Sequence, residues 1–93
     1  MTKIYIHPQF HTASKMAAEL QLEIPSEMKL GDLIRDVCGG DKRLLFKILD
    51  ETGTIRPHVA IFVGNDHCKY LGGLDANVAP SDDVSIYPAL SGG

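Results

Sequence analysis

The feature that most constrains the fold is the apolar run Val59–Val63, which follows His58 and is rich in β-branched residues. Such a run is typical of a strand that is central in its sheet or covered on both faces. Gly64-Asn65-Asp66 comes next and is a turn signal. A chain of 93 residues has room for one modest core around this strand and is too short for two. We therefore expect a single domain.

The composition is that of a globular protein, with 44% apolar and 23% charged residues. A net charge of −3 with scattered Lys and Arg gives no basic stripe for nucleic acid. The apolar runs are shorter than the roughly 18 residues that span a bilayer. Met1–Ile6 enters a strand pattern where a secretory signal would have an apolar core. We expect a cytoplasmic protein without nucleic-acid or membrane partners.

Two cysteines and four histidines are the candidates for metal or thiol chemistry. Cys38 and Cys68 lie outside any CxxC unit, and in a reducing compartment free thiols are expected. His67 and Cys68 are adjacent, so on a strand they would point to opposite faces. We predict no metal site, no disulfide and no catalytic triad, with the histidines at the surface or at strand ends.

Four further segments have strand character. Lys3–His7 and Glu19–Ile24 alternate apolar with polar residues, each is followed by proline, and together they predict an N-terminal hairpin. His67–Tyr70 is expected to be a short return strand. Asp82–Tyr87 predicts the last strand, with Val84 and Ile86 on one face and Pro88 closing it.

The middle of the chain predicts two helices. Ser26–Lys29 is a helix-start signature, and the pattern that follows it ends at Gly39-Gly40. Its apolar positions are Leu30, Leu33, Ile34, Val37 and Cys38. Gly31 costs roughly 1 kcal/mol relative to Ala inside a helix, which indicates a first-turn position or a close approach. Asp41 caps a short second helix that runs through Leu49. We expect the buried face of this helix to be Leu44, Leu45, Ile48 and Leu49.

The order strand, strand, helix, short helix and three strands is an α+β pattern. It describes a β-grasp, the architecture of ubiquitin, with a mixed sheet of about five strands, one main helix packed across it and a short second helix. Residues 1–88 form this domain in our interpretation. Residues 89–93 are then a flexible C-terminal tail that ends in Gly-Gly.

The second half of the chain resembles the ubiquitin-like sulfur carriers of bacteria, a family that includes the molybdopterin synthase small subunit and the thiamine sulfur carrier. Three features carry this resemblance: Ile61–Asp66, Ser81–Pro88, and Leu90-Ser91-Gly92-Gly93. Ser81–Pro88 contains the pattern D-x-V-x-I-x-P. Within the family, Leu71-Gly72-Gly73-Leu74 and Tyr87-Pro88-Ala89 look most similar to the carrier that serves cysteine biosynthesis from phosphoserine.

The resemblance implies a sulfur-donating cosubstrate, not an enzyme. An E1-like enzyme would use ATP to adenylate the Gly93 carboxylate, which a sulfur donor would convert to a thiocarboxylate. A partner synthase would then build cysteine or a related small metabolite. The carrier itself would bind no cofactor. A metalloprotease that trims the C-terminus or releases the product is a further implied partner.

The tail residues suit this chemistry. Gly92 and Gly93 have no Cβ, so the chain can pass through a narrow channel. Ala89 and Ser91 are small enough to follow. Pro88 is expected to end the sheet ladder and free the tail. Burial of Leu90 by a partner would contribute roughly 1.5 to 3 kcal/mol, and we favour this over the alternative that Leu90 folds back on the domain.

Phe62 and Tyr87 have two interpretations. Ubiquitin-like domains dock through the exposed sheet face, so the two rings could form an apolar patch for the activating enzyme. As strand aromatics they are assigned to the core, which we favour. The internal pair Gly72-Gly73 is interpreted as a loop break without sulfur chemistry.

Three alternatives remain. A molybdopterin synthase small subunit would copurify with a large catalytic subunit. A ubiquitin-like modifier would join Gly93 to lysines of target proteins. A β-grasp binding module would carry Gly-Gly incidentally, since short motifs have weak specificity.

Overall fold

The computed structural model describes residues 2–12 and 16–89. A mixed five-stranded sheet has the order β2-β1-β7-β4-β5. Its strands are β1 (Thr2–Ile6), β2 (Glu19–Leu22), β4 (Val59–Val63), β5 (Asp66–His67) and β7 (Val84–Pro88). β1 pairs antiparallel with β2, which confirms the predicted hairpin, and parallel with β7. β7 therefore occupies the centre of the sheet, and it pairs antiparallel with β4.

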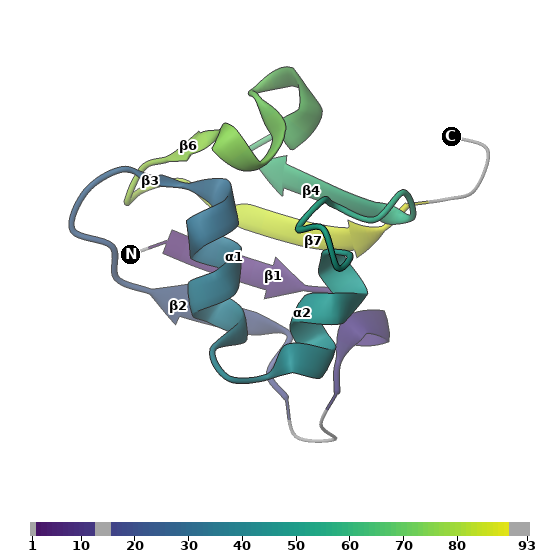
Figure 1. The fold of residues 1–93 in the computed structure, drawn as a ribbon. Coiled ribbons are helices and arrows are strands. Elements are labelled where there is room, and N and C mark those ends of the chain that lie inside the picture. The colour runs from purple at the N-terminus through teal and green to yellow at the C-terminus, as the bar shows by residue number, and fades with distance from the viewer. Residues whose placement is uncertain (1, 13–15, 90–93) are drawn as a thin grey trace.

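Two helices, α1 (Leu30–Cys38) and α2 (Lys42–Ile48), pack on one face of the sheet (Figure 1). A second, two-stranded sheet pairs β3 (Met28–Lys29) with β6 (Asn77–Val78). Three short 3-10 helices complete the described part of the fold. η1 (Pro8–Phe10) follows β1, η2 (Cys68–Tyr70) follows β5, and η3 (Gly73–Asp75) begins directly after Gly72. This arrangement confirms the predicted α+β, ubiquitin-like β-grasp. Within residues 2–12 and 16–89, no helix has the length and apolar character needed to cross a membrane.

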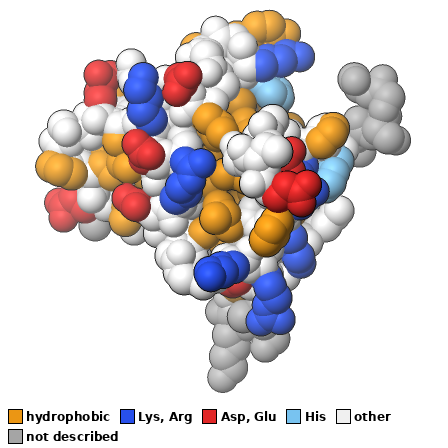
Figure 2. All heavy atoms as spheres, in the orientation of Figure 1, with side chains coloured by type: hydrophobic (Ala, Val, Ile, Leu, Met, Phe, Trp, Pro, Cys, Tyr) orange, Lys and Arg blue, Asp and Glu red, His pale blue; other side chains and the backbone are white. Residues whose placement is uncertain are grey.

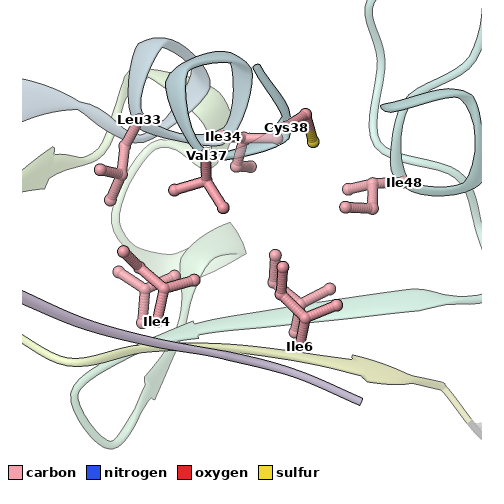
Figure 3. A pocket seen from close by; sticks show the side chains of 9 residues that line it. Ile4, Ile6, Leu33, Ile34, Val37, Cys38 and Ile48 are labelled. Atoms are coloured by element: carbon pink, nitrogen blue, oxygen red, sulfur yellow. The ribbon is translucent and has the colours of Figure 1, made fainter. Parts of the chain in front are cut away.

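The core lies between the inner face of the sheet and the two helices. Figure 3 shows Ile4 and Ile6 pointing from β1 toward Leu33 and Ile34 of α1 and Ile48 of α2. Each of these five side chains is at most 2% exposed. Burial of one such side chain stabilises the fold by roughly 1.5 to 3 kcal/mol. The core is therefore what holds the helices over the sheet.

The start of α1 differs from the sequence prediction. Met28–Lys29 was predicted to begin the helix but pairs with Asn77–Val78 of β6, and α1 begins at Leu30. Lys29 makes no side-chain capping bond. Instead, the backbone N–H of Leu30 donates to the carbonyl of Ala76 at 2.8 Å. A partner distant in the sequence replaces the local cap, which a helix-start signature cannot reveal.

Gly31 lies in the first turn of α1 and is buried against η3. A Cβ at this position would lie 3.4 Å from the Cβ of Leu74 and 3.5 Å from its carbonyl oxygen. The sequence predicted a first-turn position or a close approach, and the structure shows both. The other end of α1 is also as predicted, since Gly39 has φ +55° and donates its N–H to Arg35 and Asp36.

The predicted second helix is confirmed with a slightly shorter span. The Asp41 side chain accepts a hydrogen bond from the Leu44 backbone N–H at 3.1 Å and caps α2. Leu44 and Ile48 are buried on its inner face. Leu45 is only half-buried, which corrects its assignment to the buried face, whereas Leu49 is buried as predicted.

β4 is interior in the sheet, between β7 and β5, which confirms the prediction of a central strand. Three other predictions for the second half of the chain are corrected by the structure. The predicted strand His67–Tyr70 is instead the end of β5 followed by η2, and the irregular segment 74–81 contains β6. The last strand begins at Val84 and includes Pro88. Gly72 and Gly73 have φ +104° and +64°, which confirms the loop break.

Candidate functional site

The candidate site is the end of β7, where the domain meets its C-terminal tail. Pro88 and Ala89 lie within the described part of the chain, and residues 90–93 lie outside it. The predictions for Leu90, Ser91, Gly92 and Gly93 therefore stay predictions. The central position of β7 means that the tail begins beside β4, with β1 on the other side.

The sheet ladder does not stop before Pro88. Pro88 lies opposite Val59, and Ala89 donates its N–H to the His58 carbonyl at 2.7 Å. Alternate residues of β7 bond to opposite neighbours, so the nitrogen of Pro88 faces the β1 side. β1 ends at Ile6, and the last bond there is from the His7 N–H to the Ile86 carbonyl. Pro88 is tolerated because no backbone N–H is needed at this position to pair with β1. The strand therefore extends one residue further than predicted.

Tyr87 and Phe62 lie on the open face of the sheet, so our assignment of them to the core is wrong. The core side of the sheet takes Val84 and Ile86 of β7, and the two-residue strand period turns Tyr87 outward. The Tyr87 side chain is 41% exposed. Its ring centre lies 6.2 Å from that of Phe62 and 5.2 Å from that of Tyr5 on β1.

We call these three residues, Tyr5, Phe62 and Tyr87, the aromatic patch. Two histidines border it: the ring centre of His7 lies 6.4 Å from that of Tyr87, and the ring centre of His67 lies 5.2 Å from that of Phe62. Sequence reasoning missed Tyr5, although the alternation of Lys3–His7 places it opposite to the buried Ile4. What the sequence did not show was the parallel pairing that brings β1 beside β7.

A groove adjoins the patch and the base of the tail. Arg56 and His58 line it from the segment before β4, and His67 and Lys69 line it from β5 and η2. Ala89 also lines it. We call it the basic groove. In Figure 2, histidine side chains are visible at two separate places on the right-hand half of the molecule, whereas acidic and basic side chains are interspersed over the helices.

Comparisons of the sequence with known proteins identify relatives of this chain. A sulfur carrier homologue of Archaeoglobus fulgidus is 37% identical over 76 residues, which are 77% of this chain and 83% of that protein. The sulfur carrier protein CysO of Mycobacterium tuberculosis is 30% identical over 66 residues, which are 69% of this chain and 71% of CysO. The chain belongs to the sulfur carrier protein family.

Solved structures share the fold of this chain. The structure of Mycobacterium tuberculosis CysO has a TM-score of 0.80 at 21% identity and covers 97% of this chain and 100% of CysO. CysO of Amycolatopsis orientalis, solved in complex with BexX, has a TM-score of 0.77 at 21% identity and full coverage of both chains. At such identities the structures show the fold alone. No protein-family model matches the chain.

The carrier's own thiols are poorly suited to sulfur chemistry. Cys38 and Cys68 are free and buried. Burial, and then the charge of Asp41, raises the pKa of the Cys38 thiol to about 11. Burial likewise raises the pKa of Cys68. Because the thiolate is the nucleophile, a raised pKa disfavours nucleophilic chemistry at both thiols at neutral pH.

The histidines of the carrier lie as predicted, at strand ends and at the surface. His58 precedes β4 and is exposed, and His7 follows β1. His11 contacts the Ile6 carbonyl through its Nε2 atom at 2.9 Å. Among residues 2–12 and 16–89, no three or more His, Cys, Asp or Glu side chains are grouped where they could share a metal ion.

Proposed function

We propose that this protein carries sulfur as a thiocarboxylate on Gly93. The Gly92-Gly93 pair carries this proposal, because it lies only a few residues beyond β7 in a chain of the sulfur carrier family. Gly93 is activated either as the last residue or after a protease, proposed to be a metalloprotease, removes residues that follow it.

The proposed reaction has two steps. The Gly93 carboxylate attacks the α-phosphate of ATP on an E1-like partner, which forms an acyl-adenylate and releases pyrophosphate. A sulfur nucleophile then attacks the acyl carbon and displaces AMP, which leaves the thiocarboxylate. The carrier supplies the carboxylate and no catalytic group, and ATP is bound by the partner. Gly92 lets the tail enter the partner's channel without side-chain obstruction.

The aromatic patch is the proposed docking surface for the activating enzyme. Tyr87 is exposed while its neighbour Ile86 is buried in the core, so burial in the core does not account for the Tyr87 ring. Exposed aromatic residues are enriched at interfaces, where they contribute large contact area. Pro88 and Ala89 lie at the end of β7, the strand that carries Tyr87. Leu90 and Ser91 are proposed to enter the partner after them.

The proposed acceptor is a small metabolite on a route to cysteine, used by a sulfur-accepting synthase. This rests on the relation to CysO and on the resemblance of the segments 71–74 and 87–89. The molybdopterin synthase small subunit is the alternative within the family. A stoichiometric large subunit that copurifies from the native source and binds a pterin precursor would establish that alternative.

The test is the intact mass of the protein after incubation with ATP, the cognate activating enzyme and sulfide. The expected gain in mass is the difference between one sulfur atom and one oxygen atom. Fragment ions should locate this added mass at Gly93. Deletion of Gly93, or addition of one residue after it, should abolish the gain while the circular dichroism spectrum stays unchanged. An unmodified Gly93 would contradict the proposal, and isopeptide bonds to lysines of other proteins would indicate a ubiquitin-like modifier.

A further inference from the structure

We propose that Tyr70 is a second anchor of the surface that docks the activating enzyme, and that His67 holds the Tyr70 ring in line with the aromatic patch. This inference rests on the docking role proposed above for the aromatic patch, and it extends that surface from the sheet to η2.

The first argument is the exposure of Tyr70. Its side chain is 76% exposed, and no other large hydrophobic side chain in residues 2–12 and 16–89 is more exposed. Leu71, the next residue, is 41% exposed. A single exposed apolar side chain is ordinary, but an adjacent pair that includes a tyrosine offers area that a partner can bury. Tyrosine is also enriched at protein interfaces.

The second argument is a continuous row of rings that ends at Tyr70. The β4–β5 register places His67 opposite Phe62, so both side chains lie on the open face of the sheet. The ring centre of His67 lies 5.2 Å from that of Phe62 and 6.5 Å from that of Tyr70. Both pairs are edge-to-face, which is a favoured geometry for aromatic rings. The row therefore runs from Tyr5 and Tyr87 through Phe62 and His67 to Tyr70.

The third argument is that His67 also fixes the backbone that carries Tyr70. The His67 Nδ1 atom accepts a hydrogen bond from the Lys69 N–H at 3.1 Å and caps η2. The Leu71 N–H donates to the Cys68 carbonyl at 2.8 Å, and the Cys68 side chain is buried in the core. The Lys69 Nζ atom lies 5.1 Å from the centre of the Tyr70 ring. Tyr70 is thus presented on an anchored turn, which reduces the entropy that is lost when a partner covers it.

The fourth argument identifies the activating enzyme as the occupant. Gly93 comes five residues after Pro88, the last residue of β7, and five residues span at most about 18 Å. An enzyme that holds Gly93 in its active site therefore lies close to the end of β7 and to Tyr87. A stable interface buries about 800 Å² on each partner, whereas one aromatic side chain buries at most about 250 Å². The three rings of the aromatic patch are too small for this area, and the row of rings extends the surface to Tyr70.

The test is the affinity of the E1-like enzyme of the native source for the full chain without ATP, measured by isothermal titration calorimetry. Tyr70→Ala should weaken the affinity about tenfold, the effect of losing one interface anchor, and should leave the urea midpoint unchanged. The matched control is Phe46→Ala, because Phe46 is also an exposed aromatic residue but lies on α2. An unchanged affinity of Tyr70→Ala, equal weakening by both variants, or no binding of the native chain would overturn the proposal.

A double-mutant cycle tests the positioning role of His67. Because His67 is proposed to act through Tyr70, His67→Ala should weaken the affinity, and the double variant should bind no more weakly than Tyr70→Ala alone. His67→Asn keeps a hydrogen-bond acceptor at the cap of η2 and should recover part of the affinity. Additive losses in the double variant would show that His67 does not act through Tyr70.

Addition of ATP and sulfide to the same samples separates this inference from the chemistry proposed at Gly93. If Gly93 stays unmodified while Tyr70→Ala weakens binding, the proposed chemistry fails and the docking surface stands. If Gly93 of the Tyr70→Ala chain is activated with the native second-order rate, the chemistry stands and the role of Tyr70 is overturned.

Discussion

At the scale of single residues, Val84 shows how the alternation along β7 separates core from surface. Val84 is 1% exposed and lies in register with Ile4 on one side and Val63 on the other. Val84→Asp would bury an uncompensated charge, and we expect a loss of free energy of unfolding on the order of 4 kcal/mol. Urea denaturation measures this loss. The control is Ser85→Asp, because Ser85 faces the open side of the sheet, and it should lower the free energy of unfolding far less. Equal losses for the two variants would mean that the register of β7 is wrong.

Cys38 predicts a pH dependence of stability on the alkaline side. Its pKa is raised from 9.0 to about 11 in the fold, so between these values the unfolded chain has lost the proton that the folded chain retains. The stabilisation is therefore complete below pH 9 and decreases as the pH rises toward 11. Urea midpoints from pH 8 to 11 should fall less for Cys38→Ala than for the native protein. A parallel decline would contradict the shift.

At the scale of secondary-structure elements, α2 depends on Asp41. A hydrogen bond from the Thr12 hydroxyl, and then the Leu44 N–H, lower the pKa of Asp41 below its ordinary value of 3.8. The stabilisation is present above that ordinary value and is lost as the pH falls through the lower folded pKa. Asp41→Ala should lower the urea midpoint at neutral pH. Asp41→Asn should retain most of the cap but remove part of the acid dependence, and an unchanged dependence would show that other carboxylates cause it.

The strands show which elements could be predicted from the sequence. The alternation in β1, β2 and β7 was sufficient to predict them within two residues, because each pattern is set by neighbouring residues. β3, β5 and β6 have two residues each. A period cannot be read from such short segments, and they are strands only because a partner lies beside them.

At the scale of the whole molecule, the helices on one face leave the aromatic patch open on the other. Tyr87→Ala should lower the second-order rate of Gly93 activation about tenfold, the effect of losing an interface anchor, while the urea midpoint changes little. The measurement is the rate of pyrophosphate release against carrier concentration. Phe46→Ala is the control, since Phe46 is 53% exposed on α2. If both variants slowed activation equally, the patch would not be the docking surface.

The sequence by itself determined the strand and helix patterns, the Asp41 cap, the close approach at Gly31 and the Gly92-Gly93 tail. These are properties of one residue or of near neighbours along the chain. The tertiary structure decided that Tyr87 and Phe62 are on the open face with Tyr5, that Ala89 extends the ladder past Pro88, and that Arg56 and Lys69 line one groove. The physical reason is that these features depend on pairing between segments far apart in the sequence, and burial of the apolar face fixes that pairing only in the folded molecule.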